Sequence, residues 1–325
     1  PVTLTHGGTF QSTAGDISLT NAANSFGGSV RALTGAGTWD IDLRAAGDLT
    51  LEQIFSDTAR LRAGGAVTQI GTVRLTGDGA VEAGGDITLS NGGNSFGGAL
   101  RLSGQAATIG ATGPVTFGAS TLASLSATVN GAIGQSGALD VAGGTAVSTS
   151  GDAVALDAVG NRFGGGIAVL TTAGGAPAAD VSLSADGALS LGAITADGLR
   201  AQAGAALTQT AALTAAGDVS LVSNGALALN QNNTIAGDLD AASQGGDISV
   251  VAAGATIGGA MSLNARGGAT LGDVLVQIDG AASLGAMDAR QVQVYAKDGI
   301  DGPGALSVSG AARFETDGGD IALTN

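Results

Sequence analysis

The sequence predicts an all-β fold, a β-solenoid in which short strands coil around a narrow apolar core. Three observations predict it: the chain repeats itself, its strands alternate apolar and polar residues, and its composition favours small side chains. Of the 325 residues, 58 are glycine, 44% are hydrophobic and only 3% are aromatic. Small and aliphatic side chains suit a narrow core better than a deep globular one.

Two markers define the repeat. The strand start Gly-Asp-Ile stands at residues 15–17, 85–87 and 319–321. The turn Asn-x-Phe-Gly-Gly stands at residues 24–28, 94–98 and 161–165, with a degenerate copy at residues 233–237. The apolar residue of this turn recurs after 70, 67 and 72 residues. Fixed-period self-similarity is the signature of stacked architectures, and this period has room for about three coils. A β-sandwich would leave the self-similarity unexplained.

A third marker, Ala-x-x-Gln, ends at Gln69, Gln135 and Gln209, each time before another alternating strand. The strands themselves are predicted by segments such as Leu100-Arg101-Leu102, because strict alternation marks one buried and one exposed face. The alternating runs end in Gly-Gly, Gly-Asp, Asn-Gly or Asp-Gly, where positive φ angles cost little.

We expect roughly 15 coils at a spacing of about 4.8 Å, with Val, Leu, Ile and Ala in the interior. Residues 1–325 are predicted to form a single continuous solenoid segment, an excerpt of a longer array, because the first residues already match the repeat. Residues 1–240 should hold regular super-repeats and residues 241–325 more irregular ones, since the markers drift there.

The repeated turns supply the first candidate residues, which we expect to shape the corners of the coils. They are Asn24, Phe26, Gly27, Asn94, Phe96, Gly97, Asn161, Phe163 and Gly164. An asparagine at such a position either adopts left-handed backbone geometry or bonds neighbouring turns as a polar ladder. We favour the turn geometry.

Charge and composition exclude several classes of partner. The formal net charge is −15, from 27 acidic and 12 basic residues. Nucleic acid is an improbable partner, because phosphate binding depends on clustered Lys and Arg. No apolar stretch is long enough to cross a bilayer as a helix, so we expect no membrane insertion. Cysteine is absent, which removes disulfides and thiolate metal sites, and we expect no cofactor and no metal site.

The repeated phrases are similar to those of filamentous-haemagglutinin-like exoproteins, very large bacterial surface proteins exported by two-partner secretion or as autotransporters. The phrases that carry this resemblance are Gly-Asp-Ile-x-Leu-x-Asn, Asn-x-Phe-Gly-Gly-x-Val/Leu and Thr-Gln-x-Gly-x-Leu, the last seen at residues 135–139. The resemblance covers most of the chain to about residue 240. It implies a right-handed parallel β-helix, an extracellular location at the bacterial outer-membrane surface, and a role in adhesion or biofilm. It transfers no functional residue.

Candidate chemistry is sparse. Asp40 and Asp42 share an outer face with Arg44, and paired carboxylates can perform acid–base catalysis. We interpret them instead as a solvated face with a local ion pair. Trp39 shares parity with Ile41, which predicts a place in the core. No catalytic residue is assigned, and we expect the chain not to be an enzyme.

Three outward residues are candidates for contact with a partner. Tyr295 is predicted to lie exposed on the same face as Gln291 and Gln293, where it can contact a glycan or a protein. Arg31 and Arg101 occupy equivalent outward positions one super-repeat apart and can pair with Asp across coils.

These observations lead to three hypotheses. The first is a structural and adhesive rod, a stalk or filament of a bacterial exoprotein. The second is a laterally assembling fibre, sheath or matrix protein. The third, a polysaccharide-acting β-helix enzyme, is disfavoured because Lys297 is the only lysine. The expected partners are neighbouring coils of the same chain, further copies in a fibre, and a surface glycan or protein.

Overall fold

The computed structural model describes residues 1–252, 254–302 and 304–324, and it divides into two compact units, residues 1–162 and 163–325. The described residues form strands and turns without a helix. Most strands pair in parallel with the strand one turn before and one turn after, which confirms the predicted β-solenoid. The described parts of the two units together contain about 16 turns, close to the number predicted.

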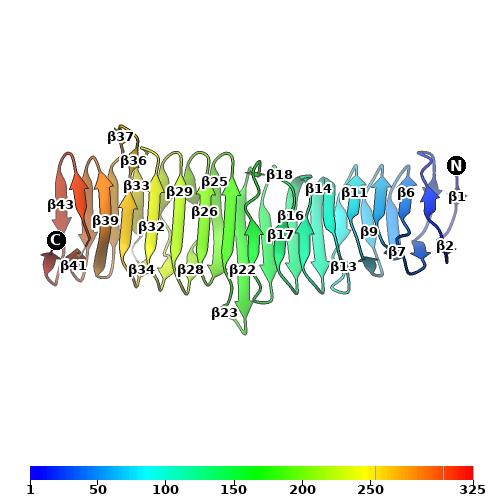
Figure 1. Cartoon of the computed structure of the whole chain (residues 1–325), viewed down its shortest axis with the longest axis horizontal. Coiled ribbons are helices and arrows are strands. Elements are labelled where there is room, and N and C mark those ends of the chain that lie inside the picture. Colours follow the sequence, from blue (N-terminus) through cyan, green and yellow to red (C-terminus); the bar gives the residue numbers. More distant parts are fainter. Residues whose placement is uncertain (253, 303, 325) are drawn as a thin grey trace. The chain divides into compact units, whose positions relative to one another are not determined.

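Two rows of stacked strands organise unit 1 (Figure 1). The first row contains β6 (Ile41–Ala45), β8 (Ala59–Ala63), β11 (Gly79–Ala83) and the start of β14 (Ala99–Ala111). The second row contains β7 (Leu49–Ser56), β9 (Val67–Gln69), β12 (Ile87–Leu89), the end of β14, β16 (Ser120–Val129) and β19 (Thr145–Thr149). Core residues of successive turns are direct partners, as in the series Leu43, Leu61, Val81 and Leu102.

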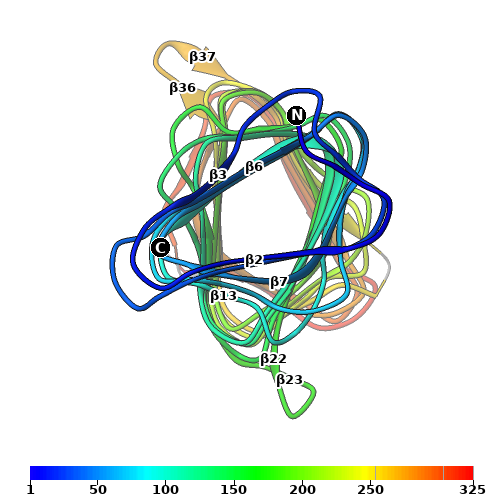
Figure 2. The same ribbon diagram turned by 90° about the vertical axis from the view of Figure 1, so that its right-hand side faces the viewer.

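Further strands of unit 1 complete its turns. They are β1 (Thr3–Leu4), β2 (Gly8–Ser12), β3 (Ile17–Leu19), β4 (Ser25–Phe26), β5 (Val30–Thr34), β10 (Val73–Leu75), β13 (Ser95–Phe96), β15 (Val115–Phe117), β17 (Ile133–Gln135), β18 (Leu139–Val141) and β20 (Val154–Leu156). Seen along the stack, the turns of this unit lie over one another as closed loops (Figure 2).

Unit 2 is built in the same way. One row contains β24 (Val181–Ala185), β26 (Leu199–Ala203), β29 (Val219–Ser223), β32 (Leu239–Ser243), β35 (Met261–Asn264) and β39 (Ala282–Ala289). A second row contains β25 (Leu189–Ala196), β27 (Leu207–Gln209), β30 (Leu227–Leu229), β33 (Ile248–Ala252), β38 (Val274–Ile278), β40 (Val292–Ala296) and β43 (Ala312–Glu315). Shorter strands complete the turns: β28 (Leu213–Ala215), β31 (Thr234–Ile235), β34 (Thr256–Ile257), β41 (Ile300–Gly302), β42 (Leu306–Val308) and β44 (Ile321–Leu323).

Two antiparallel hairpins project from the turns of unit 2 (Figures 1 and 2). One pairs the end of β22 (Gly166–Ala173) with β23 (Ala176–Pro177), and the other pairs β36 (Arg266–Gly267) with β37 (Thr270–Leu271). Their tips contain Gly174, Gly175 and Gly268, whose φ angles of 60°, 86° and 59° are positive and so favour glycine.

The predicted alternation is confirmed by the burial of the strands. Leu100 and Leu102 are 1% and 2% exposed, while Arg101 between them lies on the surface. Inward side chains such as Leu61 in unit 1 and Leu221 in unit 2 therefore fill the core of the coil. Each lies directly opposite its counterpart in the next turn. Trp39 departs from its prediction in degree: it keeps the parity of Ile41 but is only partly buried, and it lies in the turn before β6, which begins at Ile41.

Close approach of successive turns, and not positive φ, explains the glycines of the repeated turns. The φ angles of Gly27 and Gly97 are not positive, so left-handed geometry does not explain why glycine stands at these two positions. A Cβ at Gly97 would lie 2.2 Å from the carbonyl oxygen of Thr76, and one at Gly27 would lie 2.6 Å from that of Thr5. These carbonyls belong to the preceding turn, so only glycine allows the backbones to stack.

Gly97→Ala should destabilise unit 1 by about 1–3 kcal/mol, because the new methyl group overlaps a backbone oxygen that has no room to move. Gly92→Ala is the matched control in the same turn, since a Cβ there would have no neighbouring atom within 4 Å and its φ is not positive. Urea unfolding followed by circular dichroism measures both changes. Equal midpoints for the two variants would contradict the close-approach explanation.

Candidate functional site

A buried pair of amide side chains marks the corner of the repeat. Asn94 is fully buried, and its Oδ1 accepts hydrogen bonds from the Val73 N–H at 2.8 Å and from Gln69 Nε2 at 2.9 Å. Its Nδ2 donates to Gln69 Oε1 at 2.9 Å, to the Leu89 carbonyl at 2.9 Å and to the Gly110 carbonyl at 3.0 Å. One side chain thus joins three successive turns. We call the reciprocal pair Gln69–Asn94 the amide bracket.

The amide bracket recurs in both units. In unit 1, Gln135 and Asn161 exchange the same two bonds at 2.9 and 3.0 Å, and Asn161 Oδ1 also accepts from the Leu139 N–H at 2.8 Å. In unit 2, Gln209 and Asn233 exchange them at 2.9 and 3.0 Å. A buried amide without partners costs several kcal/mol, so complete pairing is what makes these positions tolerable in the core.

The favoured explanation of these asparagines is therefore wrong, and the alternative is correct. None of the described non-glycine residues has a positive φ, so Asn24, Asn94 and Asn161 do not supply left-handed geometry. Asn24 bonds the Val2 N–H at 2.7 Å and the Leu19 carbonyl at 2.8 Å through its side chain. Asparagine is needed here because one amide group donates and accepts at once.

The glutamine partners were missed by sequence reasoning, although a signal existed. Gln69, Gln135 and Gln209 precede their asparagines by 25, 26 and 24 residues, a nearly constant separation. Each is the last residue of the Ala-x-x-Gln marker. A separation slightly longer than one coil indicates a bond between neighbouring turns.

Aspartates form a second repeated device. Aspartates in both units accept a backbone N–H from the following turn through Oδ1, at 2.8–3.1 Å; the described examples include Asp16, Asp48, Asp78, Asp86, Asp180, Asp218, Asp238 and Asp247. A Cβ at Gly98 would lie 2.5 Å from Asp78 Oδ1, and one at Gly237 would lie 2.3 Å from Asp218 Oδ1. The glycine makes room for the carboxylate, which explains why the repeat is rich in both residues.

The aromatic residues of the repeated turns point into the core. Phe26, Phe96 and Phe163 are 9%, 6% and 5% exposed. The Phe26 ring meets Phe10 edge to face, with centroids 6.3 Å apart. Ile235 fills the corresponding place in the degenerate turn and is 1% exposed. Gly164, next to Phe163, lies exposed at the surface.

The two predicted outward arginines have different partners. Arg101 pairs with Asp78 of the preceding turn at 2.9 Å, as predicted. This bond, together with the Ala99 N–H, lowers the pKa of Asp78 from its ordinary value of 3.8. Arg31 is partly buried and donates to Gln53 Oε1 at 3.1 Å instead of to an aspartate.

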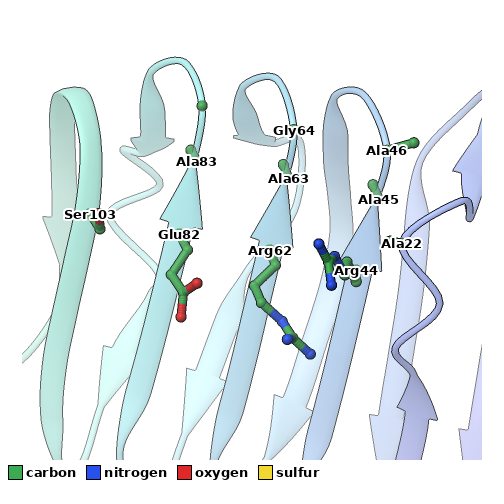
Figure 3. Close-up of a pocket in the computed structure, with 11 residues that line it drawn as sticks. Ala22, Arg44, Ala45, Ala46, Arg62, Ala63, Gly64, Glu82, Ala83 and Ser103 are labelled. Atoms are coloured by element: carbon green, nitrogen blue, oxygen red, sulfur yellow. The ribbon is translucent and has the colours of Figure 1, made fainter.

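A shallow groove of about 400 Å³ lies on the outer face of β6, β8 and β11 (Figure 3). Its charged lining residues are Arg44, Arg62 and Glu82, and its small ones include Ala45, Ala63 and Ala83. We call it the arginine groove. The predicted carboxylate pair lies at its edge but is not brought together as a catalytic pair, because Asp42 binds Arg62 at 2.5 Å while Asp40 accepts the Thr58 hydroxyl at 2.7 Å.

A second shallow groove, of about 330 Å³, lies on the outer face of β38, β40 and β43 in unit 2 and includes Tyr295. Tyr295 is half-buried, and its hydroxyl donates to Asp317 at 2.6 Å, which raises the pKa of the phenol. Gln277 is its direct partner in the preceding turn, and Gln293 shares the groove. This tyrosine groove presents an aromatic side chain among polar ones.

Clusters of metal-ligating side chains and long apolar helices are both absent from the described residues. No group of three or more His, Cys, Asp or Glu side chains gathers there as ligands. The same part of the chain contains no helix long and apolar enough to cross a bilayer.

Parallel stacking and the recurring amide bracket define a repeat protein of the β-solenoid class. The chain belongs to a family described as repeats of unknown function (DUF5649), which matches residues 2–33, 37–103, 104–170, 178–242 and 271–325. Each of the three segments 37–103, 104–170 and 178–242 contains one complete amide bracket. No curated protein and no solved structure matches the chain significantly.

Asn94→Ala should lower the stability of unit 1 by about 1–3 kcal/mol for each buried group left unpaired, since the Val73 N–H loses its acceptor and Gln69 loses both of its bonds to Asn94. Asn224→Ala, at an exposed turn position, should stay within about 0.5 kcal/mol of wild type. Urea midpoints compare the two. In a double-mutant cycle with Gln69→Ala, the bracket predicts a coupling energy of about 0.5–3 kcal/mol, and strictly additive losses would refute it.

The Asp78–Arg101 pair predicts a pH dependence of stability. The folded pKa of Asp78 lies below 3.8, so its contribution is present above the unfolded value and is lost as pH falls through the folded pKa. The gap in thermal midpoint between wild type and Asp78→Asn should therefore narrow as pH falls below 3.8. The narrowing should be weaker on an Arg101→Gln background. A gap independent of pH would show that the carboxylate charge is irrelevant.

Proposed function

We propose that this chain is a structural rod segment of a bacterial surface protein, acting as a stalk or filament in adhesion or biofilm formation. The observation that carries the proposal is the amide bracket, which returns once in each of three family repeats and bonds neighbouring turns to one another. Such a unit can be added many times without a new core, because its stabilising contacts come from adjacent turns.

The surface chemistry supports an extracellular location. With a net charge of −15, separate copies of the chain repel one another. A chain without cysteine forms no disulfide in either oxidising or reducing conditions. The resemblance to exported repeat proteins points in the same direction. The proposal assigns the chain no enzymatic activity.

The adhesive part of the proposal rests on the tyrosine groove. Tyrosine offers a rigid apolar ring with a polar end, which suits contact with a glycan or a protein surface. Arg313 and Glu315 lie on the next turn of the same groove and bond each other at 2.9 Å. The groove thus combines an aromatic ring with a positively charged guanidinium group and a negatively charged carboxylate.

Electron microscopy of intact producing cells, labelled with an antibody against this chain, tests the proposal. We expect label along thin fibres that radiate singly from the outer membrane. Cells from which the encoding gene has been deleted are the control. Label confined to the cell interior would overturn the proposed location, and label on bundled or sheet-like material would replace the stalk by a laterally assembling matrix protein.

A further inference from the structure

We propose that the arginine groove binds an oxyanion, the carboxylate or sulfate group of a ligand, with Arg44 and Arg62 as the contact residues. The groove lies on the outer face of unit 1, and the register of the strands places its charged side chains next to one another. Arg44 of β6 lies directly opposite Arg62 of β8, which in turn lies opposite Glu82 of β11.

Two arginines in direct register repel each other, because paired parallel strands lie only about 4.8 Å apart. The nearby carboxylates bind Arg60 and Arg62 but not Arg44. Asp42 binds Arg62 diagonally at 2.5 Å, and Glu82 binds Arg60 diagonally at 2.7 Å. Arg44 forms no side-chain hydrogen bond or ion pair with any described residue, in contrast to Arg101, which pairs with Asp78.

Arg62 also has a hydrogen-bond donor that remains unused. Its side chain is 19% exposed, and its Nε is buried without a hydrogen-bond partner among the described residues. The groove beside it is open because its remaining walls are small residues such as Ala63 and Gly64. In Figure 3 the side chains of Arg44 and Arg62 extend over neighbouring strands of one face. The planar guanidinium groups are suited to planar or tetrahedral oxyanions.

Arg44 is the cation of this face that lacks a partner, although the chain as a whole is acidic. Across the face Arg44, Arg60 and Arg62 stand against Asp40, Asp42 and Glu82, so the formal charges balance, yet Asp40 binds Thr58, Asp42 binds Arg62 and Glu82 binds Arg60. An oxyanion at Arg44 supplies the missing counter-charge and offsets the repulsion from Arg62. The groove's volume of about 400 Å³ accommodates the charged group together with part of the molecule that bears it.

Side-chain NMR of the whole chain tests the site directly. The arginine Nε–H signals are followed while sodium sulfate, sodium phosphate or sodium acetate is added against sodium chloride of equal ionic strength. We expect saturable shifts of the signals assigned to Arg44 and Arg62 by their loss in Arg44→Gln and Arg62→Gln. Sulfate and phosphate without acetate would identify a tetrahedral ligand group, and acetate alone a carboxylate.

Arg44→Gln should weaken binding at least about tenfold, the factor that a lost charge-assisted bond carries. Arg200→Gln is the matched control, because Arg200 is also an exposed, outward residue within a strand. In low salt without oxyanion, Arg44→Gln should unfold at the same or a higher temperature than wild type, since it removes the repulsion. Unsaturable shifts, or equal shifts at Arg44 and Arg200, would overturn the proposal.

Discussion

The spacing between turns is the constraint on which this structure depends. Parallel strands stack at about 4.8 Å, so any polar group inside the coil must find its partner one turn away or remain unsatisfied. Asn94 meets that requirement for three turns at once, through Gln69 and Val73 before it and Gly110 after it. A single asparagine at this corner thereby holds three turns in register.

The same spacing explains the unusual composition. Where an aspartate caps an N–H of the next turn, a glycine often stands beside that N–H and leaves room for the carboxylate, as at Asp78 and Gly98. Glycine elsewhere is needed where a carbonyl of the preceding turn lies against the backbone, as at Gly97. Stacking thus accounts for many of the Gly and Asp residues, while positive φ angles require glycine at other turns, such as Gly151, and at hairpin tips such as Gly174.

Because the inward residues and corners maintain the fold, the outward positions are free to differ from turn to turn. Some are used for ion pairs between neighbouring turns, as at Arg101 and Asp78. Others leave a charge or an aromatic ring uncovered, as at Arg44 and Tyr295. Differences between turns at outward positions thus leave the fold unchanged while they alter the chemistry of the surface.

The amino-acid sequence was enough to predict the solenoid class, the period of about 70 residues, the inward and outward faces, and the repeated turns that contain Phe26, Phe96 and Phe163. These follow from alternation and repetition, which are local properties of the chain. The side chains that meet across turns are known only from the folded chain. Gln69 binds Asn94, and Arg62 binds Asp42, so Arg44 has no ion-pair partner among the described residues. Bonds between turns among the described residues include spans from 16 to 26 residues, so the register cannot be read from a fixed step along the sequence.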